Sequence, residues 1–266
     1  MKINEMTVNE IREFIKKCDS SLGEGEKSIL SQDPREGVRK LYQQCCRLES
    51  LADKERLRLK HLRIYEDDAN RQGFNLIAGV DEAGRGPLAG PVVAAAVIMP
   101  KGLDITGIDD SKKLSPAKRE KLSREIKEQA LCWSVGISSV QEIDSINILR
   151  ASLLAMQRAV TALKLVPDYI LVDALTIPGL KTPQLPIIKG DGKSISIAAA
   201  SIIAKVTRDK MMETIDREFP NYGFARHKGY GTADHLDALK KHGLCPLHRK
   251  TFTKSLKTAD INGRLW

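Results

Sequence analysis

Residues 76–91 read LIAGVDEAGRGPLAGP, and a second apolar run, Val92–Met99, follows directly. Both runs are short, partly β-branched and bounded by glycine and proline, which predicts two β-strands. The first strand ends at two adjacent carboxylates, Asp81 and Glu82. Neighbouring strand residues point to opposite faces of a sheet. In a regular strand only one of the two acids therefore faces a given site, and the other reaches that site from the strand edge.

The loop after the acids, Gly84-Arg85-Gly86, favours a ligand rather than a simple turn. Glycines on both sides of an arginine let the backbone approach a ligand closely and present several N–H groups to it. The guanidinium between them suits a phosphate. Acids for a cation beside donors for a phosphate indicate metal-assisted phosphoryl chemistry. The alternative is a turn with solvated acids, because Asp before a glycine-rich loop is common in turns.

The charge of the chain is unevenly distributed. The 266 residues carry a formal net charge of +9, yet residues 1–70 hold 14 basic and 14 acidic residues. The whole excess therefore lies in residues 71–266, and residues 221–266 alone hold 9 basic and 3 acidic residues. A basic surface beside an acidic pocket suits a polyanion that is cut at a metal site. The alternative is that the basic excess serves only solubility.

Several classes of protein are disfavoured by the sequence. No apolar run approaches the roughly 20 residues that span a bilayer, and residues 1–20 lack the core of a signal peptide, so we expect a cytoplasmic protein without a membrane partner. The five cysteines include no C-x-x-C pair, which indicates free thiols. A zinc site at His242, Cys245 and His248 is disfavoured, because Pro246 interrupts the spacing and a fourth ligand is missing.

Residues 1–70 are predicted to form a helical N-terminal extension, and residues 71–266 a single larger domain. A first helix follows Thr7, with Val8, Ile11, Ile15 and Cys18 on one face. Residues 20–37 contain several glycines and a proline and are predicted to be a connector, and a second helix starts at Val38. The extension has no recognisable chemistry. Its role stays open between gripping nucleic acid, docking an unknown protein partner and shielding the larger domain.

The larger domain alternates between predicted strands and helices. After the first two strands the predicted elements are a helix over 116–129, a strand over 131–138, a helix over 142–164, strands over 169–173 and 185–188, a helix from Ser194 towards Phe219, and short C-terminal helices. Hairpin-like connections predict an antiparallel meander for the first three strands. The helix before strand 169–173 predicts that this strand is parallel to the first. The fold class is therefore α/β.

Four carboxylates occupy equivalent places in this plan. Asp81 and Glu82 end the first strand, Asp173 ends the parallel strand, and Asp191 lies in the turn before the long helix. The strand ends of open α/β sheets surround the ligand crevice. Two like charges about 4 Å apart cost on the order of 4 kcal/mol at an effective dielectric constant of about 20, a cost that a divalent cation removes. Oxygen ligands suit Mg²⁺ or Mn²⁺ and disfavour zinc.

Taken together, the motifs resemble those of bacterial ribonuclease HII. The resemblance runs from about residue 74 to the end of the chain, in the order of the family, and is carried by DEAGRG (81–86), VD (172–173), GDGKS (190–194), AAASIIAK (198–205) and HKGYGT (227–232). It implies a ribonuclease H-like fold: a mixed five-stranded sheet flanked by helices, with a C-terminal helical part. The extension over residues 1–70 departs from the family members that start close to the first strand.

The resemblance also implies an activity. The family implies an endoribonuclease that hydrolyses RNA in RNA–DNA hybrids and cuts 5′ to single ribonucleotides embedded in duplex DNA, leaving 3′-hydroxyl and 5′-phosphate ends, as in ribonucleotide excision repair. Carried over by position, Asp81, Glu82, Asp173 and Asp191 are the catalytic residues, and they bind the metal, Mn²⁺ or Mg²⁺.

The same carry-over implies the residues that bind the substrate. Gly84, Arg85 and Gly86 resemble the element that reads the ribonucleotide 2′-hydroxyl, the group that distinguishes RNA from DNA. Tyr230 matches the tyrosine that packs on the sugar of the following deoxynucleotide. Lys112 and Lys113 resemble phosphate contacts.

Two other interpretations remain at this point. A non-catalytic binder of hybrid or duplex nucleic acid would lack one or more of the acids, and all four are present. An enzyme of the ribonuclease HIII type would share the fold but cut only continuous RNA–DNA hybrids, and Gly84-Arg85-Gly86 argues against it.

Overall fold

The structure is a computed structural model that describes residues 3–17 and 22–259. The chain divides into two compact units, Met1–Lys60 and His61–Trp266. The predicted boundary at residue 70 stays a prediction. The short helix α4 (Ile64–Arg71) belongs to the second unit, where its Glu66 carboxylate accepts hydrogen bonds from the Ser194 hydroxyl and from the Ser196 amide, the latter at 3.0 Å.

The first unit is helical, as predicted. It contains η1 (Ile3–Glu5), α1 (Val8–Lys17), α2 (Glu24–Ser31) and most of α3 (Glu36–Leu62). Its core is formed by apolar side chains of these helices, including Ile11, Leu30, Val38 and Cys45. The prediction that residues 20–37 are only a connector was wrong, because α2 lies within it. Glu26 accepts a hydrogen bond from the Gly23 amide at 2.9 Å, which caps the helix, and Leu30 is fully buried. Cys18 lies outside the described residues.

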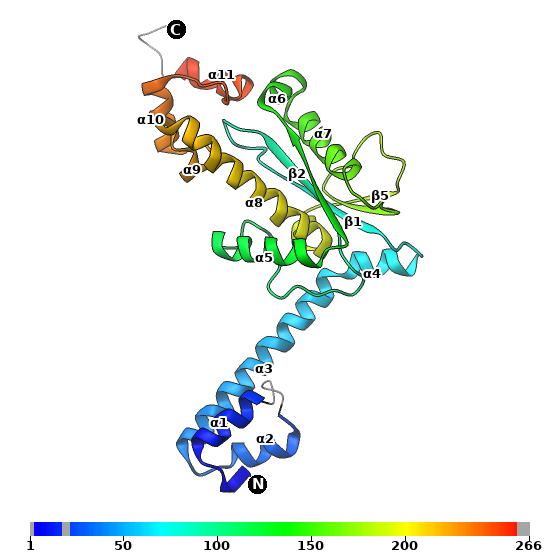
Figure 1. The fold of residues 1–266 in the computed structure, drawn as a ribbon, viewed down its shortest axis with the longest axis vertical. Helices are drawn as coiled ribbons and strands as arrows, with labels where there is room; N and C mark the ends of the chain where they lie inside the picture. Colours follow the sequence, from blue (N-terminus) through cyan, green and yellow to red (C-terminus); the bar gives the residue numbers. More distant parts are fainter. Residues whose placement is uncertain (1–2, 18–21, 260–266) are drawn as a thin grey trace. The chain divides into compact units, whose positions relative to one another are not determined.

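The second unit is built on a mixed five-stranded sheet with the order β3-β2-β1-β4-β5 (Figure 1). The strands are β1 (Ile77–Ala83), β2 (Val92–Ile98), β3 (Cys132–Ser138), β4 (Tyr169–Asp173) and β5 (Gln184–Ile187). β1, β2 and β3 pair antiparallel, whereas β4 pairs parallel to β1 and to β5. This confirms the predicted α/β class, the antiparallel meander and the parallel strand.

Two helices cover the two faces of the sheet. One face packs Ala78 and Val80 against α7 (Ile148–Thr161), and the other carries Ile77 and Leu171 against α8 (Ile195–Glu218) (Figure 1). The alternation follows from the two-residue period of a strand. α8 lies very close to β1, because an ideal Cβ on Gly79 would stand 2.0 Å from the carbonyl carbon of Ser196. Close packing of α8 on the sheet therefore depends on the absence of a side chain at Gly79.

The predicted helix over residues 142–164 is divided in the structure. α6 (Val140–Ile146) and α7 are separated at Asn147, whose φ is +70°. The Asn147 side chain accepts a hydrogen bond from the Arg150 amide at 3.1 Å and so caps α7. Asparagine tolerates this left-handed conformation and is a strong N-cap residue. The apolar period continues across the break, which is why the sequence pattern alone predicted one helix.

The second unit contains further helices that connect its strands, precede α8 or follow it. α5 (Pro116–Gln129) connects β2 to β3, η2 (Gly190–Gly192) precedes α8, and the predicted C-terminal helical part consists of η3 (Pro220–Tyr222), α9 (Phe224–His227), α10 (Ala233–His242) and α11 (Lys250–Ala259). None of the helices within the described residues is both long and apolar enough to cross a membrane. The cytoplasmic location stays a prediction.

We expect Gly79→Ala to destabilise the second unit by at least about 3 kcal/mol, because the added methyl group meets backbone atoms that cannot move aside without shifting α8. Urea denaturation followed by circular dichroism measures the change. Gly192→Ala is the control, since a Cβ there has nothing within 4 Å. An unchanged unfolding midpoint for Gly79→Ala would contradict the close packing.

Candidate active site

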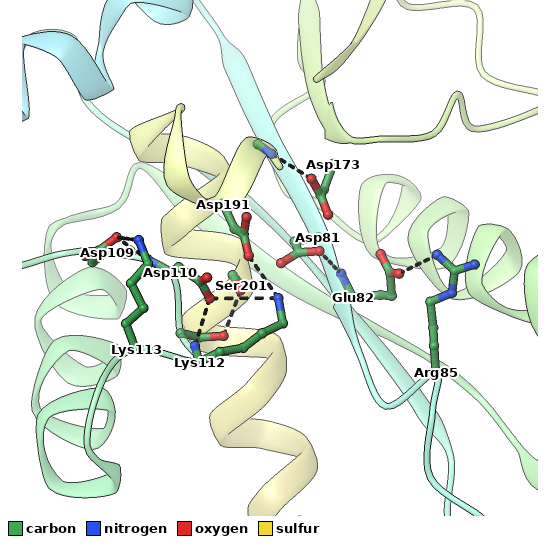
Figure 2. Close-up of polar contacts among 12 residues, drawn as sticks. Asp81, Glu82, Arg85, Asp109, Asp110, Lys112, Lys113, Asp173, Asp191 and Ser201 are labelled. Carbon is green, nitrogen blue, oxygen red and sulfur yellow. Dashed lines mark hydrogen bonds and ion pairs between the residues drawn. The ribbon is translucent and has the colours of Figure 1, made fainter. Parts of the chain in front are cut away.

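The predicted acids lie at the carboxyl ends of β1 and β4 and before α8. Val80 pairs with Val172 in the parallel register, so the next residues along each strand are Asp81 and Asp173. Strand alternation directs both side chains to the face that α8 covers and directs Glu82 to the opposite face. Asp191 comes from η2, directly before α8. Figure 2 shows the Asp81, Asp173 and Asp191 side chains directed to one region, with Glu82 beside them.

Local hydrogen bonds orient these carboxylates. Asp81 Oδ1 accepts from the Glu82 amide at 2.7 Å, and Ser201 of α8, which is hydrogen-bonded to Ser111 at 2.9 Å, counteracts the rise in the pKa of Asp81. Asp173 Oδ1 accepts from the Gly190 amide at 2.7 Å, which ties the end of β4 to the turn that carries Asp191 (Figure 2). The site is therefore assembled from β1, β4, η2 and α8. Ser201 lies within the motif AAASIIAK, but the sequence analysis gave it no role, because a serine within an apolar helix does not by itself indicate a function.

Burial and mutual repulsion raise the pKa values of Asp81, Glu82 and Asp173. Burial, followed by the charges of Glu82 and Asp173, raises the pKa of Asp81 well above its usual value. Burial likewise raises the pKa of Glu82 and of Asp173, and Asp191 adds to the rise at Asp173. Several carboxylates therefore share a small, poorly solvated volume, and their ionised forms need a compensating positive charge.

The loop Asp109–Lys113 supplies such a charge. Lys112 Nζ lies 2.9 Å from Asp191 Oδ2, although 75% of the Lys112 side chain is exposed. Burial would lower the pKa of Lys112, but the hydrogen bond to Asp191 and the charges of Asp191, Asp110 and Asp81 raise it. Lys113 is directed to Asp109 instead, at 3.2 Å (Figure 2). Of the two lysines predicted to touch phosphate, the structure thus places Lys112 among the acids and Lys113 outside them.

The acidic residues fit a divalent cation in their chemistry but are not yet arranged around one. Among residues 3–17 and 22–259, no three His, Cys, Asp or Glu side chains form a ready metal-binding group. Asp191 is engaged by Lys112, Glu82 by Arg85 and Asp173 by Gly190. Glu82 Oε2, however, is buried without a hydrogen-bond partner in the described chain. An unsatisfied carboxylate oxygen among repelling carboxylates suits a hard cation with oxygen ligands.

The predicted ribose-reading residues lie next to the acids. Arg85 Nη1 donates to Glu82 Oε1 at 3.2 Å (Figure 2). Gly84 has a φ of +98°, and an ideal Cβ there would stand 2.1 Å from Arg208 Nε, so the position requires glycine. An ideal Cβ on Gly86 would lie 3.7 Å from a ring carbon of Tyr230. The structure therefore brings Tyr230, which is 43% exposed, to the loop of Gly84–Gly86.

Two buried arginines were not predicted. Arg208 and Arg249 are 1% and 0% exposed, and neither forms an ion pair with a carboxylate in the described part of the chain. Their guanidinium groups donate to backbone carbonyls of residues 84–91 and of Lys228 instead. Burial lowers the pKa of Arg249 to about 9, which still leaves it charged at neutral pH.

The histidines of the C-terminal part do not form a zinc site. The Nε2 atoms of His248 and His235 lie 3.0 Å apart. The Nδ1 atom of His248 accepts a hydrogen bond from the Cys245 amide at 2.9 Å. His242 instead lies beside the Tyr222 ring. The four cysteines that the structure describes are free thiols, as predicted.

A basic groove of about 540 Å³ opens beside Tyr230. It is lined by α5, α8 and α9, and its cationic side chains are Arg119, Lys205, Lys210, Arg226 and Lys228. They outnumber the three acids of the groove, Glu120, Asp209 and Glu213. The basic excess of residues 71–266 is therefore partly concentrated next to the acidic site.

We expect Asp81→Asn to raise the melting temperature of the metal-free protein by at least about 2 °C at pH 8, the shift that roughly 1 kcal/mol produces in a unit of this size. Because the pKa of Asp81 is raised in the folded state, ionisation of Asp81 lowers the stability of the folded protein as pH rises. The gain in melting temperature from Asp81→Asn therefore shrinks as pH falls towards 5. Calorimetry in chelator measures it. Glu128→Gln, at an exposed position of α5, is the control, and an equal gain at both pH values would contradict this account.

Comparisons with known proteins identify the family. The family model described as Ribonuclease HII matches residues 78–255, and that described as Ribonuclease HII N-terminal domain matches residues 7–70. Ribonuclease HII of Clostridioides difficile (strain 630) is 48% identical over 254 residues, which cover 96% of this chain and 100% of that relative. Ribonuclease HII of Ruminiclostridium cellulolyticum is 54% identical over 218 residues, covering 82% of this chain and 86% of that relative.

Solved structures agree with this result. Ribonuclease H2 from Pyrococcus horikoshii OT3 is 30% identical with a TM-score of 0.57, covering 68% of this chain and 95% of that chain. Bst-RNase HIII in complex with Mn²⁺ is 19% identical with a TM-score of 0.53, covering 72% of each chain, a likeness that concerns the fold alone. The extension over residues 7–70 is thus a domain that the family itself contains. The chain belongs to the ribonuclease HII family and is a nuclease of the class that hydrolyses RNA–DNA hybrids.

Proposed function

We propose that this chain is a divalent-metal-dependent endonuclease that cuts RNA in RNA–DNA hybrids and also cuts 5′ to single ribonucleotides in duplex DNA, leaving 3′-hydroxyl and 5′-phosphate ends. The observation that carries the proposal is the convergence of Asp81, Asp173 and Asp191 beside Glu82 and the loop of Gly84–Gly86. Incision beside a lone ribonucleotide is the first step of ribonucleotide excision repair, which is the process that we propose for it.

The four acids would hold Mg²⁺ or Mn²⁺ through carboxylate oxygens. The unpartnered Glu82 Oε2 and the crowding that raises the pKa of Asp81 support this assignment. The chemistry that such a cation supplies when bound is the activation of water and the neutralisation of charge on the phosphate. Lys112 holds Asp191 in a charge-compensated state, and its exposed stem lets the ammonium turn towards a substrate phosphate. Lys113, exposed and paired only with Asp109 in the described chain, is a weaker phosphate contact.

Substrate selection falls to the loop of Gly84–Gly86 and to Tyr230. The glycines allow peptide groups to approach a ribose, and a peptide N–H or C=O can bind the 2′-hydroxyl, which is both donor and acceptor. Arg85 is 43% exposed at its side chain and can reach a phosphate from its place beside Glu82. The Tyr230 ring presents a flat apolar face that accepts a deoxyribose and disfavours a further hydroxyl. The basic groove beside Tyr230 continues this path for the DNA backbone.

We expect Asp173→Asn to lower the cleavage rate of a hybrid at least about 10³-fold, because an assigned metal ligand and several kcal/mol of transition-state stabilisation are lost. Binding of the hybrid should be unchanged or tighter, since one negative charge near phosphate is removed. Gel cleavage assays and fluorescence anisotropy measure the two quantities, with Glu128→Gln as the control. Mg²⁺- or Mn²⁺-dependent cutting by Asp173→Asn at the wild-type rate would overturn the assignment.

We expect Arg85→Ala and Tyr230→Ala to reduce cleavage at a single ribonucleotide by about tenfold or more relative to cleavage of a long hybrid. A junction offers one productive register, whereas a long hybrid offers many, so lost contacts at the junction matter more there. Steady-state kcat/KM values on the two labelled duplexes provide the measurement. Equal loss on both duplexes would count against junction reading.

A further inference from the structure

The two ribose-reading elements meet a third segment, residues 245–249, directly before α11. Its main chain is bonded to the loop that follows Gly84–Gly86: the Gly90 amide donates to the Leu247 carbonyl and the Arg249 amide to the Leu88 carbonyl, each at 2.8 Å. An isolated antiparallel bridge also joins Ala89 to His248. The C-terminal segment is thus paired with the loop of residues 84–91.

Arg249 holds this loop from inside the protein. Its Nη2 donates to the Gly84 carbonyl at 2.6 Å and its Nη1 to the Arg85 carbonyl at 2.9 Å. Its Nε and Nη2 both donate to the Gly90 carbonyl, at 3.0 and 2.8 Å. A fully buried guanidinium without a carboxylate partner is costly, and here its donors are used on carbonyls of a single loop. The planar fork thereby fixes the orientation of successive peptide groups.

The orientation of these peptides has a direct consequence for a ligand. In a trans peptide the C=O and the following N–H point in opposite directions, and the structure contains no cis peptide among its described residues. Because Arg249 draws the carbonyls of Gly84 and Arg85 inward, the amides of Arg85 and Gly86 point away from Arg249. Those amides are the groups that a ribose hydroxyl or a phosphate would meet.

His248, the residue before Arg249, is linked by hydrogen bonds to Tyr230, the second ribose-reading element. His248 Nδ1 accepts from the Cys245 amide, so in the neutral ring the proton lies on Nε2 and is donated to His235 Nε2 at 3.0 Å. The His235 proton then lies on Nδ1 and is donated to the Tyr230 carbonyl at 2.9 Å. The hydrogen-bond network assigns these tautomers. His235 and His248 are 0% and 2% exposed, so the chain from residue 248 to Tyr230 is shielded from water.

We propose that residues 245–249 are the positioning element of ribose recognition: Arg249 sets the peptide groups of Gly84–Gly86, and His248, through His235, sets Tyr230. The inference deepens the proposed function and rests on it. Arg249 and His248 touch no reacting atom, and they act on specificity through the spacing and orientation of the groups that do. Adjacent residues of one short segment fix the two reading elements relative to each other.

The test is the substrate preference of Arg249→Lys in the full chain. The preference is the kcat/KM on a duplex with one ribonucleotide divided by that on a continuous hybrid. Lysine keeps the charge but cannot bind three carbonyls in a fixed fork. We expect the preference to fall by about tenfold to a hundredfold, as for a displacement of about 1 Å at a recognition site. We also expect faster hydrogen exchange at the amides of Leu88 and Gly90, whose hydrogen bonds to the carbonyls of Gly229 and Leu247 hold the same loop. Lys250→Ala removes a neighbouring exposed charge and is the matched control.

His235 provides a second variant pair that decides the question if Arg249→Lys fails to fold. His235→Leu removes both links, whereas His235→Asn keeps a side-chain amide near Nδ1 that can still donate to the Tyr230 carbonyl. We expect a loss of preference in His235→Leu, a partial rescue in His235→Asn, and no further loss when His235→Leu is added to Tyr230→Ala. Equal losses on both duplexes, or an additive loss in the double variant, would overturn the proposal.

Failure of the proposed function would look different. If the wild-type protein cut long hybrids but ignored single ribonucleotides, junction reading itself would be wrong. The hydrogen-exchange measurement would still report whether Arg249 holds the loop that contains Gly84–Gly86. Unchanged exchange at the amides of Leu88 and Gly90 in folded Arg249→Lys would overturn the positioning role alone.

Discussion

The parallel register between β1 and β4 is the constraint on which the site depends. Because Val80 pairs with Val172, both strands reach their acids, Asp81 and Asp173, at the same level of the sheet. A shift of one residue would send either carboxylate to the opposite face. The hydrogen bond from the Gly190 amide to Asp173 then brings the turn of Asp191 to the same place. Asp81 and Asp173, which are far apart in the chain, thus meet because of backbone pairing and despite their mutual repulsion.

The resulting crowding of negative charge explains the cationic groups around it. Lys112 is bonded to Asp191 and Arg85 to Glu82, so each of these acids has a basic partner within the protein. The two cationic side chains are partly exposed, whereas the carboxylates they bind are each only 8% exposed, so either cation leaves its acid at little cost only when another positive charge takes its place. Lys112 and Arg85 are also among the residues that we assign to phosphate. The same charges can therefore stabilise the empty site and attract the substrate.

The fold could be predicted from the sequence because its strands are short apolar runs bounded by glycine and proline, as in residues 76–99, and because helix and strand alternate later. The four acids were recognisable from their places at strand ends and in a turn. Two local features were not predicted, for physical reasons. The Gly23 amide donates a hydrogen bond to Glu26 and so caps the start of α2, and Asn147 interrupts an apolar period that continues on both of its sides. Neither changes the hydrophobic pattern that sequence interpretation depends on.

A different reason explains why the sequence did not predict the contacts of Arg208, Arg249, His235 and His248. Their partners are mostly backbone carbonyls, and a carbonyl is present at every position of a sequence, so nothing in the pattern marks which one is bound. Sequence interpretation finds residues whose own chemistry suits a ligand, such as Asp81. It does not find residues that act on the backbone of another segment, although the glycines of residues 84–90 gave an indirect sign that something approaches the loop closely.

Helix α8 contacts both the acids and the segments of residues 89–91 and 228–230, and so it holds these two parts of the site at a fixed spacing. Ser201 lowers the pKa of Asp81 against the effect of burial, Lys205 lies over the Tyr230 ring at 5.9 Å from its centre, and Arg208 binds the carbonyls of Ala89, Pro91 and Lys228. These residues are spaced by four and three, so they share one face of the helix. At a rise of 1.5 Å per residue, Ser201 and Arg208 lie about 10 Å apart along its axis, so α8 reaches from the acids to the carbonyls of Ala89 and Pro91. The close approach of Gly79 to the backbone of Ser196 fixes α8 on the sheet, and with it the positions of Ser201 and Arg208 relative to β1.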